Sequence, residues 1–256
     1  MALLSSRQAT KYFGGLCAVD NLDLTVNEGE IFALIGPNGS GKTTFTNLAT
    51  GMMAPTSGHV EFQGTIVSGQ RPHAITQMGL VRTFQNLRIF SSLTVLEHVT
   101  LGHFCRTTTG VWSNILRTKQ VKEEEEEIRA RAEEVLDFLG LLDKKNWLAK
   151  NLPYGQQRLL EIARALATEP KLIILDEPAA GMTMQESNDL IHLIRSIRDR
   201  GITVFLIDHK MRLVMNVSER IAVLNFGRKI AEGTPKEIQE NPDVIEAYLG
   251  KGRRTA

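Results

Sequence analysis

Hydrophobic and polar residues alternate over two short segments near the N-terminus, residues 21–26 and 58–64. A period of two predicts strands with one buried face, and we expect the second to lie at a sheet edge. Between them, residues 31–35 are continuously apolar and lead into glycines, which predicts a strand buried on both faces. The first quarter of the chain is therefore expected to join an antiparallel part to the start of a parallel core.

The middle of the chain, residues 94–168, is predicted to be helical. One segment, residues 119–139, combines many charges with apolar residues at helical spacing, namely Ile128, Val135, Leu136 and Leu139. Residues 123–127 are five consecutive glutamates, which raises the alternative of a cation site. Consecutive residues point to different sides of a helix, so a solvated helix face is the favoured interpretation.

Two further apolar runs, residues 171–175 and 202–207, predict buried strands, and the segment between them predicts a helix over residues 185–200. Strand, helix and strand in this order predict a right-handed crossover between parallel strands. The expected fold class is therefore α/β, with a parallel-sheet core. Neither an internal repeat nor a linker rich in glycine, proline or serine divides the sequence, so we expect a single domain over residues 1–256.

Composition and charge exclude several classes of protein. The chain has 256 residues, of which 42% are hydrophobic, so it is not a disordered or low-complexity protein. Thirty basic against 29 acidic residues argue against nucleic-acid binding through bulk charge. Two isolated cysteines, Cys17 and Cys105, indicate ordinary reduced thiols. We expect no signal peptide and no membrane span of roughly 18 apolar residues, so any membrane role would depend on a partner.

A glycine-rich segment follows the apolar run at residues 31–35 and fits the pattern GxxxxGK[ST]. It consists of Gly36, Pro37, Asn38, Gly39, Ser40, Gly41, Lys42 and Thr43, and a helical run including Thr44 follows. Glycines allow backbone N–H groups to turn inward around phosphate oxygens, where a helix N-terminus adds its positive dipole end. We expect Lys42 to reach the β- and γ-phosphates and the Thr43 hydroxyl to ligate Mg²⁺. The alternative is a glycine-rich turn without a ligand, but the position between strand and helix favours a nucleoside triphosphate.

Two adjacent carboxylates, Asp176 and Glu177, follow the apolar run at residues 171–175. Ligands of open parallel sheets lie at the carboxyl ends of the strands, so Asp176 is placed to hold Mg²⁺ through water. Glu177 is then placed to act as general base on the attacking water. The alternative is a pair of helix-capping groups. His209 follows the next buried strand, where spacing alone leaves a γ-phosphate contact and an unremarkable histidine equally open.

The segment at residues 151–158 reads Asn-Leu-Pro-Tyr-Gly-Gln-Gln-Arg and precedes the Asp176 strand. It resembles the signature motif of ATP-binding cassette (ABC) proteins, usually Leu-Ser-Gly-Gly-Gln. The resemblance implies nucleotide binding by the residues at the motif positions, Pro153, Tyr154, Gly155 and Gln156. It also places them at the opening of a helix, which we expect over residues 159–168.

Other positions match further motifs of the same family. Gln85 resembles the glutamine of the Q-loop, which implies a catalytic role and a contact with Mg²⁺. His209 matches the switch histidine, and residues 181–182 resemble the D-loop. Phe13 stands where the family stacks a ring on adenine, with Tyr12 as the neighbouring candidate. The resemblance implies a RecA-like P-loop NTPase core over residues 1–85 and 166–256, with an inserted α-helical subdomain over residues 86–165.

Three stretches narrow the resemblance to the branched-chain amino-acid import ATPases, residues 79–90, 152–158 and 177–182. This subfamily implies ATP and Mg²⁺ as cofactors and a second ABC subunit, unlike this one, in a head-to-tail dimer. It also implies two transmembrane permease subunits, a periplasmic or lipoprotein substrate-binding protein, and a peripheral position on the cytoplasmic face of the plasma membrane. Related systems on the same architecture import urea or other amides. No nucleic-acid partner is expected.

The signature departs from the general family pattern, because Pro153 and Tyr154 replace serine and glycine. The serine hydroxyl that would meet the γ-phosphate across the dimer is therefore absent. Proline is disfavoured inside a helix by roughly 3 kcal/mol but is accepted in the first turn, so a helix N-terminus can still face phosphate. Gly155 and Gln156 remain as donors. We ask whether the site completed by this signature hydrolyses ATP as fast as its counterpart.

Coupling to a permease would run through the groove beside Gln85 and the following residues 86–90. Leu87, Ile89 and Phe90 could equally belong to the core of the helical subdomain, and we expect a mixed role. An iron–sulfur assembly cassette and a lipid or polysaccharide exporter ATPase also fit the length. Residues 79–86 and the Pro-Tyr signature argue against both.

Overall fold

The computed structural model describes residues 1–85, 87, 89–103 and 119–249. Its core is a six-stranded sheet in which all neighbouring strands are parallel except the pair β9 and β10. In spatial order the strands are β10 (Arg228–Gly233), β9 (Arg220–Asn225), β3 (Ile31–Ile35), β8 (Thr203–Ile207), β7 (Leu172–Asp176) and β6 (Leu80–Arg82). The predicted parallel core is therefore confirmed.

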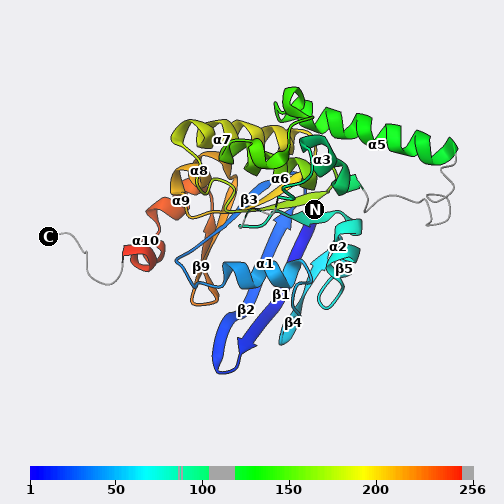
Figure 1. The fold of residues 1–256 in the computed structure, drawn as a ribbon. Helices are drawn as coiled ribbons and strands as arrows, with labels where there is room; N and C mark the ends of the chain where they lie inside the picture. The colour runs from blue at the N-terminus through cyan, green and yellow to red at the C-terminus, as the bar shows by residue number, and fades with distance from the viewer. Residues whose placement is uncertain (86, 88, 104–118, 250–256) are drawn as a thin grey trace.

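A second, antiparallel sheet covers one face of this core (Figure 1). Its strands are, in spatial order, β2 (Leu16–Asn27), β1 (Ala2–Phe13), β4 (Ser57–Phe62) and β5 (Thr65–Ile66). The predicted edge position of β4 is wrong, because β4 lies between β1 and β5, which pairs with Glu61 and Phe62. The antiparallel part expected near the N-terminus is nevertheless present.

The continuously apolar strands are explained by two hydrophobic cores, one on each face of the parallel sheet. In β3, Phe32 and Leu34 belong to the core shared with the antiparallel sheet, whereas Ile31, Ala33 and Ile35 belong to the core under the helices. Strands β7 and β8 divide their residues in the same way. Because successive side chains point to opposite faces, a strand between two cores needs apolar residues at every position.

The helices also divide between these two faces. Helix α1 (Lys42–Ala49) packs into the core on the antiparallel side through Phe45 and Leu48. The core on the opposite face receives residues from α3 (Val95–His103), α5 (Lys119–Phe138), α6 (Tyr154–Leu166), α7 (Met184–Asp199), α8 (Met211–Val217), α9 (Pro235–Glu240) and α10 (Pro242–Leu249). Short segments complete the order, namely α2 (Pro72–Met78) and the 3₁₀ turns Leu142–Lys144 and Ala149–Asn151. In Figure 1, α3, α5, α6 and α7 lie together at the top.

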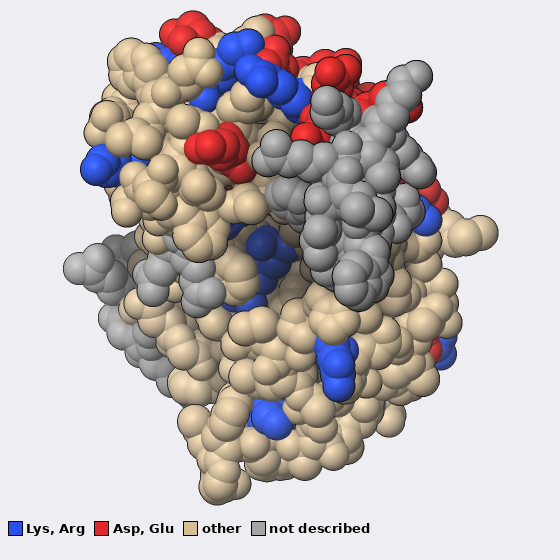
Figure 2. Space-filling view, turned by 45° about the vertical axis from the view of Figure 1, so that its right-hand side comes forward, with Lys and Arg blue, Asp and Glu red and all other residues tan. Residues whose placement is uncertain are grey.

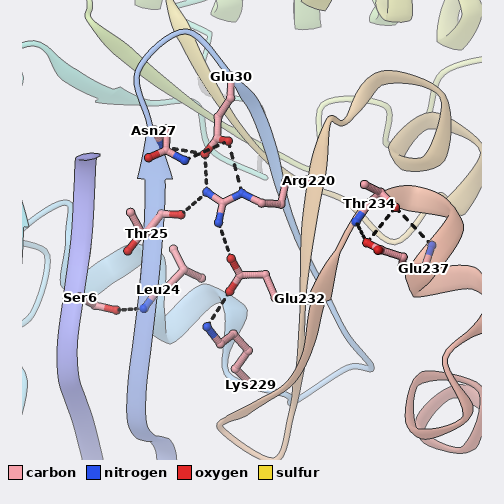
Figure 3. Close-up of polar contacts among 10 residues, drawn as sticks. All are labelled: Ser6, Leu24, Thr25, Asn27, Glu30, Arg220, Lys229, Glu232, Thr234 and Glu237. Atoms are coloured by element: carbon pink, nitrogen blue, oxygen red, sulfur yellow. Dashed lines mark hydrogen bonds and ion pairs between the residues drawn. The ribbon is translucent and has the colours of Figure 1, made fainter. Parts of the chain in front are cut away.

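One arginine ties the two sheets together. Arg220, at the start of β9, donates to the Thr25 carbonyl on β2 at 2.6 Å and pairs with Glu30 and Glu232 (Figure 3). Its guanidinium also lies 4.8 Å from the centre of the Phe32 ring. Because a planar guanidinium carries five donors in a fixed geometry, it can bridge several elements at once. The antiparallel sheet is thereby held against the strands that carry the phosphate loop.

Two differences from the sequence predictions have local causes. Strand β1 was not predicted, because its register shifts beside Gln8, which has φ +47°, and the shift interrupts the alternation of buried residues. Helix α6 begins at Tyr154 rather than at residue 159, with Pro153 as its N-cap residue. Helix α5 buries Ala132 and Leu136 and exposes most of the glutamate run, as the solvated-face interpretation expects. Cys105 lies outside the described residues.

Candidate nucleotide-binding site

The phosphate loop joins the buried strand β3 to helix α1, as predicted. Two of its glycines are required by close contacts. A Cβ atom on Gly36 would lie 2.2 Å from the Leu224 carbonyl oxygen, and one on Gly41, where φ is +106°, would lie 2.4 Å from the Ala18 carbonyl oxygen. Gly39, in contrast, has nothing within 4 Å of its Cβ position. The loop is thus seated on β2 and β9 while its tip, at Asn38 and Gly39, is exposed.

Lys42 is folded back into this loop. Its Nζ donates to the Gly36 and Pro37 carbonyls at 2.8 and 2.9 Å and lies 3.4 Å from the Ser40 hydroxyl. Partial burial lowers the pKa of Lys42, and the nearby carboxylates Glu177 and Asp176 oppose that shift. The ammonium is therefore held inside the loop by the loop's own carbonyl groups. Thr43 is exposed and Thr44 is half-buried beside it at the helix start.

Asp176 ends β7 inside a buried ion pair that the sequence reasoning missed. The Arg82 guanidinium on β6 contacts its carboxylate at 2.5 Å, and both side chains are only 6% exposed. Arg82 also donates to Asn47 Oδ1 at 2.6 Å, which connects the pair to α1. The signal available in the sequence was an arginine at the end of the strand that pairs with β7.

Three of the predicted residues meet at the end of β7. The Gln85 amide nitrogen Nε2 donates to Glu177 Oε2 at 2.9 Å, and His209 Nδ1 lies 3.6 Å from Glu177 Oε1. Glu177 has φ +49°, and its backbone N–H donates to the Ile207 carbonyl at 2.7 Å. Neither carboxylate of the Asp176–Glu177 pair caps the helix that follows, since α7 is capped by Thr183. The capping alternative is therefore wrong.

The side chain of Asp208 stabilises the turn that carries His209. Its carboxylate is almost fully buried and accepts the backbone N–H groups of Lys210 at 2.8 Å and Ala179 at 3.4 Å. Burial is the main cause that raises the pKa of Asp208. Lys210 Nζ in turn donates to the Ala179 carbonyl at 2.5 Å. These contacts join the ends of β7 and β8, and so they keep His209 beside Glu177.

The signature residues lie at the start of α6. Gly155 is buried, and a Cβ atom there would lie 2.2 Å from Glu186 Oε1 on α7. The Gln156 amide oxygen accepts from Lys144 Nζ at 3.0 Å, and Tyr154 is 45% exposed. No side chain caps this helix start, so N–H groups of its first turn have no partner within the helix. Within the described ranges, no hydrogen bond or ion pair joins this segment to the phosphate loop.

The hairpin that carries Phe13 lies beside the phosphate loop. Phe13 and Tyr12 end β1 and are each 47% exposed. In the returning strand β2, Asp20 N–H donates to the Gly227 carbonyl, and Gly227 N–H donates to the Ser40 carbonyl of the loop, both at 2.9 Å. An exposed ring next to a phosphate loop is available for stacking on a base.

A sequence profile described as "ABC transporter" matches residues 19–180, which is more than half of the chain. The chain belongs to the ABC transporter family. A second profile, described as "Branched-chain amino acid ATP-binding cassette transporter", matches residues 228–253. The family resemblance and the ATPase-cassette fold expected from the sequence are confirmed, and nucleotide binding follows from membership of the family.

Curated relatives of this ABC protein cover nearly its whole length. It is 45% identical over 240 residues to the "High-affinity branched-chain amino acid transport ATP-binding protein LivG" of Salmonella typhimurium, covering 93% of this chain and 94% of that one. The protein of the same description in Escherichia coli is 44% identical over 250 residues, with 97% and 98% covered. The "Probable branched-chain amino acid transport ATP-binding protein LivG" of Methanocaldococcus jannaschii is 34% identical, with 98% of both chains covered.

Solved structures of ABC cassettes share the fold. The ADP conformation of "an ATP-binding cassette of an ABC transporter" has a TM-score of 0.85 at 34% identity, covering 98% of this chain and 100% of that one. A dimeric cassette in a post-hydrolysis state, bound to ADP and Pi, has a TM-score of 0.76 at 27% identity, covering 91% and 98%. None of the helices in the described part of this chain is long and apolar enough to cross a membrane.

Proposed function

We propose that this ABC protein is the Mg²⁺-dependent, ATP-hydrolysing subunit of an importer for branched-chain amino acids. The single observation that carries the hydrolytic part is the meeting of Gln85, Glu177 and His209 at the end of β7. The names of the relatives, which cover the chain almost completely, support the solute class.

The residues present fit ATP and Mg²⁺. The exposed tip of the loop around Gly39 leaves room for phosphate, and Lys42 provides a charge inside it. Thr43 and Asp176 offer hydroxyl and carboxylate oxygens, which are the ligands that Mg²⁺ prefers, and Gln85 offers an amide oxygen on the same side. Mg²⁺ bound with ATP would neutralise charge on the transferred phosphoryl group. The exposed ring of Phe13 would stack on adenine.

Each polar group at the end of β7 has a role in hydrolysis. Glu177 is the general base, because its carboxylate can accept a proton from the attacking water. Gln85 and His209 lie within 2.9 and 3.6 Å of its two oxygens, so they hold the carboxylate and orient the water. The hydrogen bonds of Asp208 and Lys210 stabilise the turn that positions His209.

The site is completed by a second cassette. The first-turn N–H groups at Tyr154–Gln156 lie apart from the chain's own phosphate loop, and an uncapped helix start suits an anion. A head-to-tail dimer would bring the partner's nucleotide to Pro153, Tyr154, Gly155 and Gln156. The dimeric form of a structural relative supports this arrangement, and the Pro-Tyr signature favours an unlike partner.

A permease would dock in the groove beside the Gln85 segment. A cavity of about 380 Å³ lies there, lined among others by Met52, Arg82, Phe84 and Arg164. Figure 2 shows this side of the molecule hollowed, with basic side chains at the bottom of the hollow. Residues 86 and 88 of this segment lie outside the described residues. Phe90 is 55% exposed, whereas Ile89 packs against the core, which supports the mixed role that we propose for the segment. Docking of two permeases would place the chain on the cytoplasmic face of the plasma membrane.

Partner capture and uptake test the proposal. The tagged full-length chain is isolated in mild detergent from its native cell, and its partners are identified by mass spectrometry. Two polytopic permeases and a second, unlike cassette are expected. Only soluble partners would instead favour a cassette of the iron–sulfur assembly type.

Uptake of radiolabelled leucine and of urea is then compared in cells that lack the chain and in cells that regain it. Leucine uptake should return with the wild-type chain and not with Lys42→Ala. Return of urea uptake alone would contradict the solute class while leaving the importer intact.

A further inference from the structure

A buried arginine at the end of the signature segment, to which the sequence analysis gave no role, connects the start of α6 to the Gln85 segment. Arg158 lies one helical turn after Tyr154 on α6, and its side chain is only 5% exposed. Its guanidinium donates to the backbone carbonyls of Phe84 at 3.1 Å and Gln85 at 2.5 Å. The charge is balanced by Glu161, 3.2 Å away and equally buried. A buried charge of this kind is costly unless it is paired and hydrogen-bonded, so this geometry is strongly preferred.

One nitrogen of the Arg158 guanidinium donates hydrogen bonds to two segments. Nη2 of Arg158 donates both to the Gln85 carbonyl and to the Tyr154 hydroxyl, the latter at 3.1 Å, and the guanidinium lies 5.5 Å from the centre of the Tyr154 ring. The fork of a guanidinium is rigid and planar. A shift of the α6 start therefore changes the position of the Gln85 backbone.

Gln85 is thus held from two sides. Arg158 holds its backbone carbonyl, and its side-chain amide donates to Glu177 at 2.9 Å. The Tyr154 ring also packs on Gly181, where a Cβ atom would lie 2.5 Å from ring carbon Cε1. The start of α6 therefore contacts two segments near Glu177. It contacts the Gln85 segment through Arg158 and Gly181 through the Tyr154 ring.

We propose that Arg158 is a positioning residue that makes the Gln85 segment follow the start of α6. The inference rests on the proposed function, in which a partner's nucleotide meets that helix start and Gln85 contacts Glu177 in this chain's own site. Engagement of the signature by one nucleotide is then transmitted through Arg158 to the Gln85–Glu177 contact of the other. The two ATP sites of the dimer are coupled by this route.

The test is steady-state ATP hydrolysis by the complex of the full-length chain with its partner cassette and permeases, purified with wild-type Arg158 or with Arg158→Lys. Lysine keeps the charge beside Glu161 but replaces the planar fork with a compact ammonium, which cannot bridge the carbonyls and the hydroxyl in the same way. We expect kcat to fall roughly tenfold while KM for ATP changes less than about twofold, because the lost interaction acts on the catalytic geometry. The Hill coefficient should fall toward 1.

A double-mutant cycle distinguishes positioning from general stability. If Arg158 acts through Gln85, then Arg158→Lys should lower kcat in the wild-type background and not in the Gln85→Ala background. An equal loss in both backgrounds, or an unchanged kcat in the wild-type background, overturns the inference. Absence of hydrolysis by the complex with the wild-type chain would instead contradict the proposed function.

Two further variants control for folding. Arg195→Lys changes an arginine on α7 that donates to the Asn216 carbonyl away from the site, so kcat and the Hill coefficient should not change. If Arg158→Lys lowers the melting temperature, Tyr154→Phe is used, because it removes one hydrogen bond from the same guanidinium and keeps the ring on Gly181. A smaller loss of kcat in the same direction is expected, and an unchanged kcat and Hill coefficient would contradict the coupling.

Discussion

The phosphate-loop side of the site and the signature side are built by different means. On the phosphate-loop side, backbone conformation dominates: Gly36 and Gly41 admit close carbonyl oxygens, and Lys42 donates to two loop carbonyls. On the signature side, side chains of several elements hold the helix start, through Arg158, Lys144 and Glu186. The phosphate-binding groups of the first side come from one short segment, whereas those of the second side are held by side chains that are distant in the sequence.

This difference predicts how each side fails. The phosphate loop consists of backbone groups and one charged side chain, that of Lys42. Removal of that side chain should impair function with little effect on the fold. When a side chain that holds the helix start is removed, we expect both the stability of the fold and the positioning of the signature residues to be lost.

The largest effect is expected for Glu177→Gln. Removal of the general base should lower the turnover of ATP by about 10²–10⁴-fold, while ATP still binds. Hydrolysis and nucleotide binding are measured on the same preparation, with Glu240→Gln at the end of α9 as the control. Steady hydrolysis by the Glu177→Gln variant would remove Glu177 from the role of base.

Lys42→Ala should weaken nucleotide binding itself. A charged hydrogen-bond donor contributes roughly 1.5–3 kcal/mol, which corresponds to a loss of about 10–100-fold in affinity for ATP. The affinity is measured by titration with a fluorescent ATP analogue, and Lys236→Ala on α9 is the control. An unchanged affinity would contradict the phosphate-loop assignment.

Gly181→Ala tests the packing of Tyr154 on the signature side. Gly181 has φ +74°, and the added Cβ would also clash with the Tyr154 ring, so the free energy of unfolding should fall by roughly 1–2 kcal/mol or more. Gly201→Ala is a matched control, because it has φ +84° and nothing within 4 Å of its Cβ position. Urea unfolding measures both variants, and equal losses would show that the ring contact does not matter.

The smallest effect is a pH dependence at the start of α7. Hydrogen bonds from Thr183 hold the pKa of Glu186 below its usual value of 4.5, so the folded state binds the proton more weakly than the unfolded state. The stabilisation is therefore present above pH 4.5 and is lost as the pH falls through the folded pKa. Glu186→Gln should be less stable than the wild type at pH 7.

Urea unfolding at pH 7 and pH 3.5 tests this sign, because the difference between Glu186→Gln and the wild type should shrink at the lower pH. Glu237→Gln removes the charge from the same kind of capping box on α9 and serves as the control. It should show the same trend with pH and leave ATP hydrolysis unchanged. A difference that grows on acidification would contradict the assigned hydrogen bonds.

Much of the catalytic core was predictable because its signals are local. The apolar runs of β3, β7 and β8 lie between two cores, so every position had to be apolar, and the polar groups follow directly at their carboxyl ends. Strand β1 was missed because a register shift at Gln8 interrupts its alternation. The start of α6 was placed too late because Pro153 and Gly155, poor residues inside a helix, sit at its N-terminus.

The roles of Arg82 and Arg158 could not be predicted, because an isolated arginine in a sequence has no signal for burial. Arg82 pairs with Asp176 only because β6 and β7 are neighbours in the sheet, and the two residues are 94 positions apart. Arg158 reaches the Gln85 carbonyl across 73 positions. Both contacts depend on how the helices and strands pack.

The amino-acid sequence by itself determined the phosphate loop, the carboxylates after β7 and the family of the protein, since these rest on residue types at fixed short spacings. Only the tertiary structure decided that Gln85 and His209 meet at Glu177, that Arg82 neutralises Asp176, and that Arg158 joins the signature to the Gln85 segment. The physical reason is range: backbone conformation and periodicity act over a few residues, whereas a buried charge finds its partners only after the sheet has assembled.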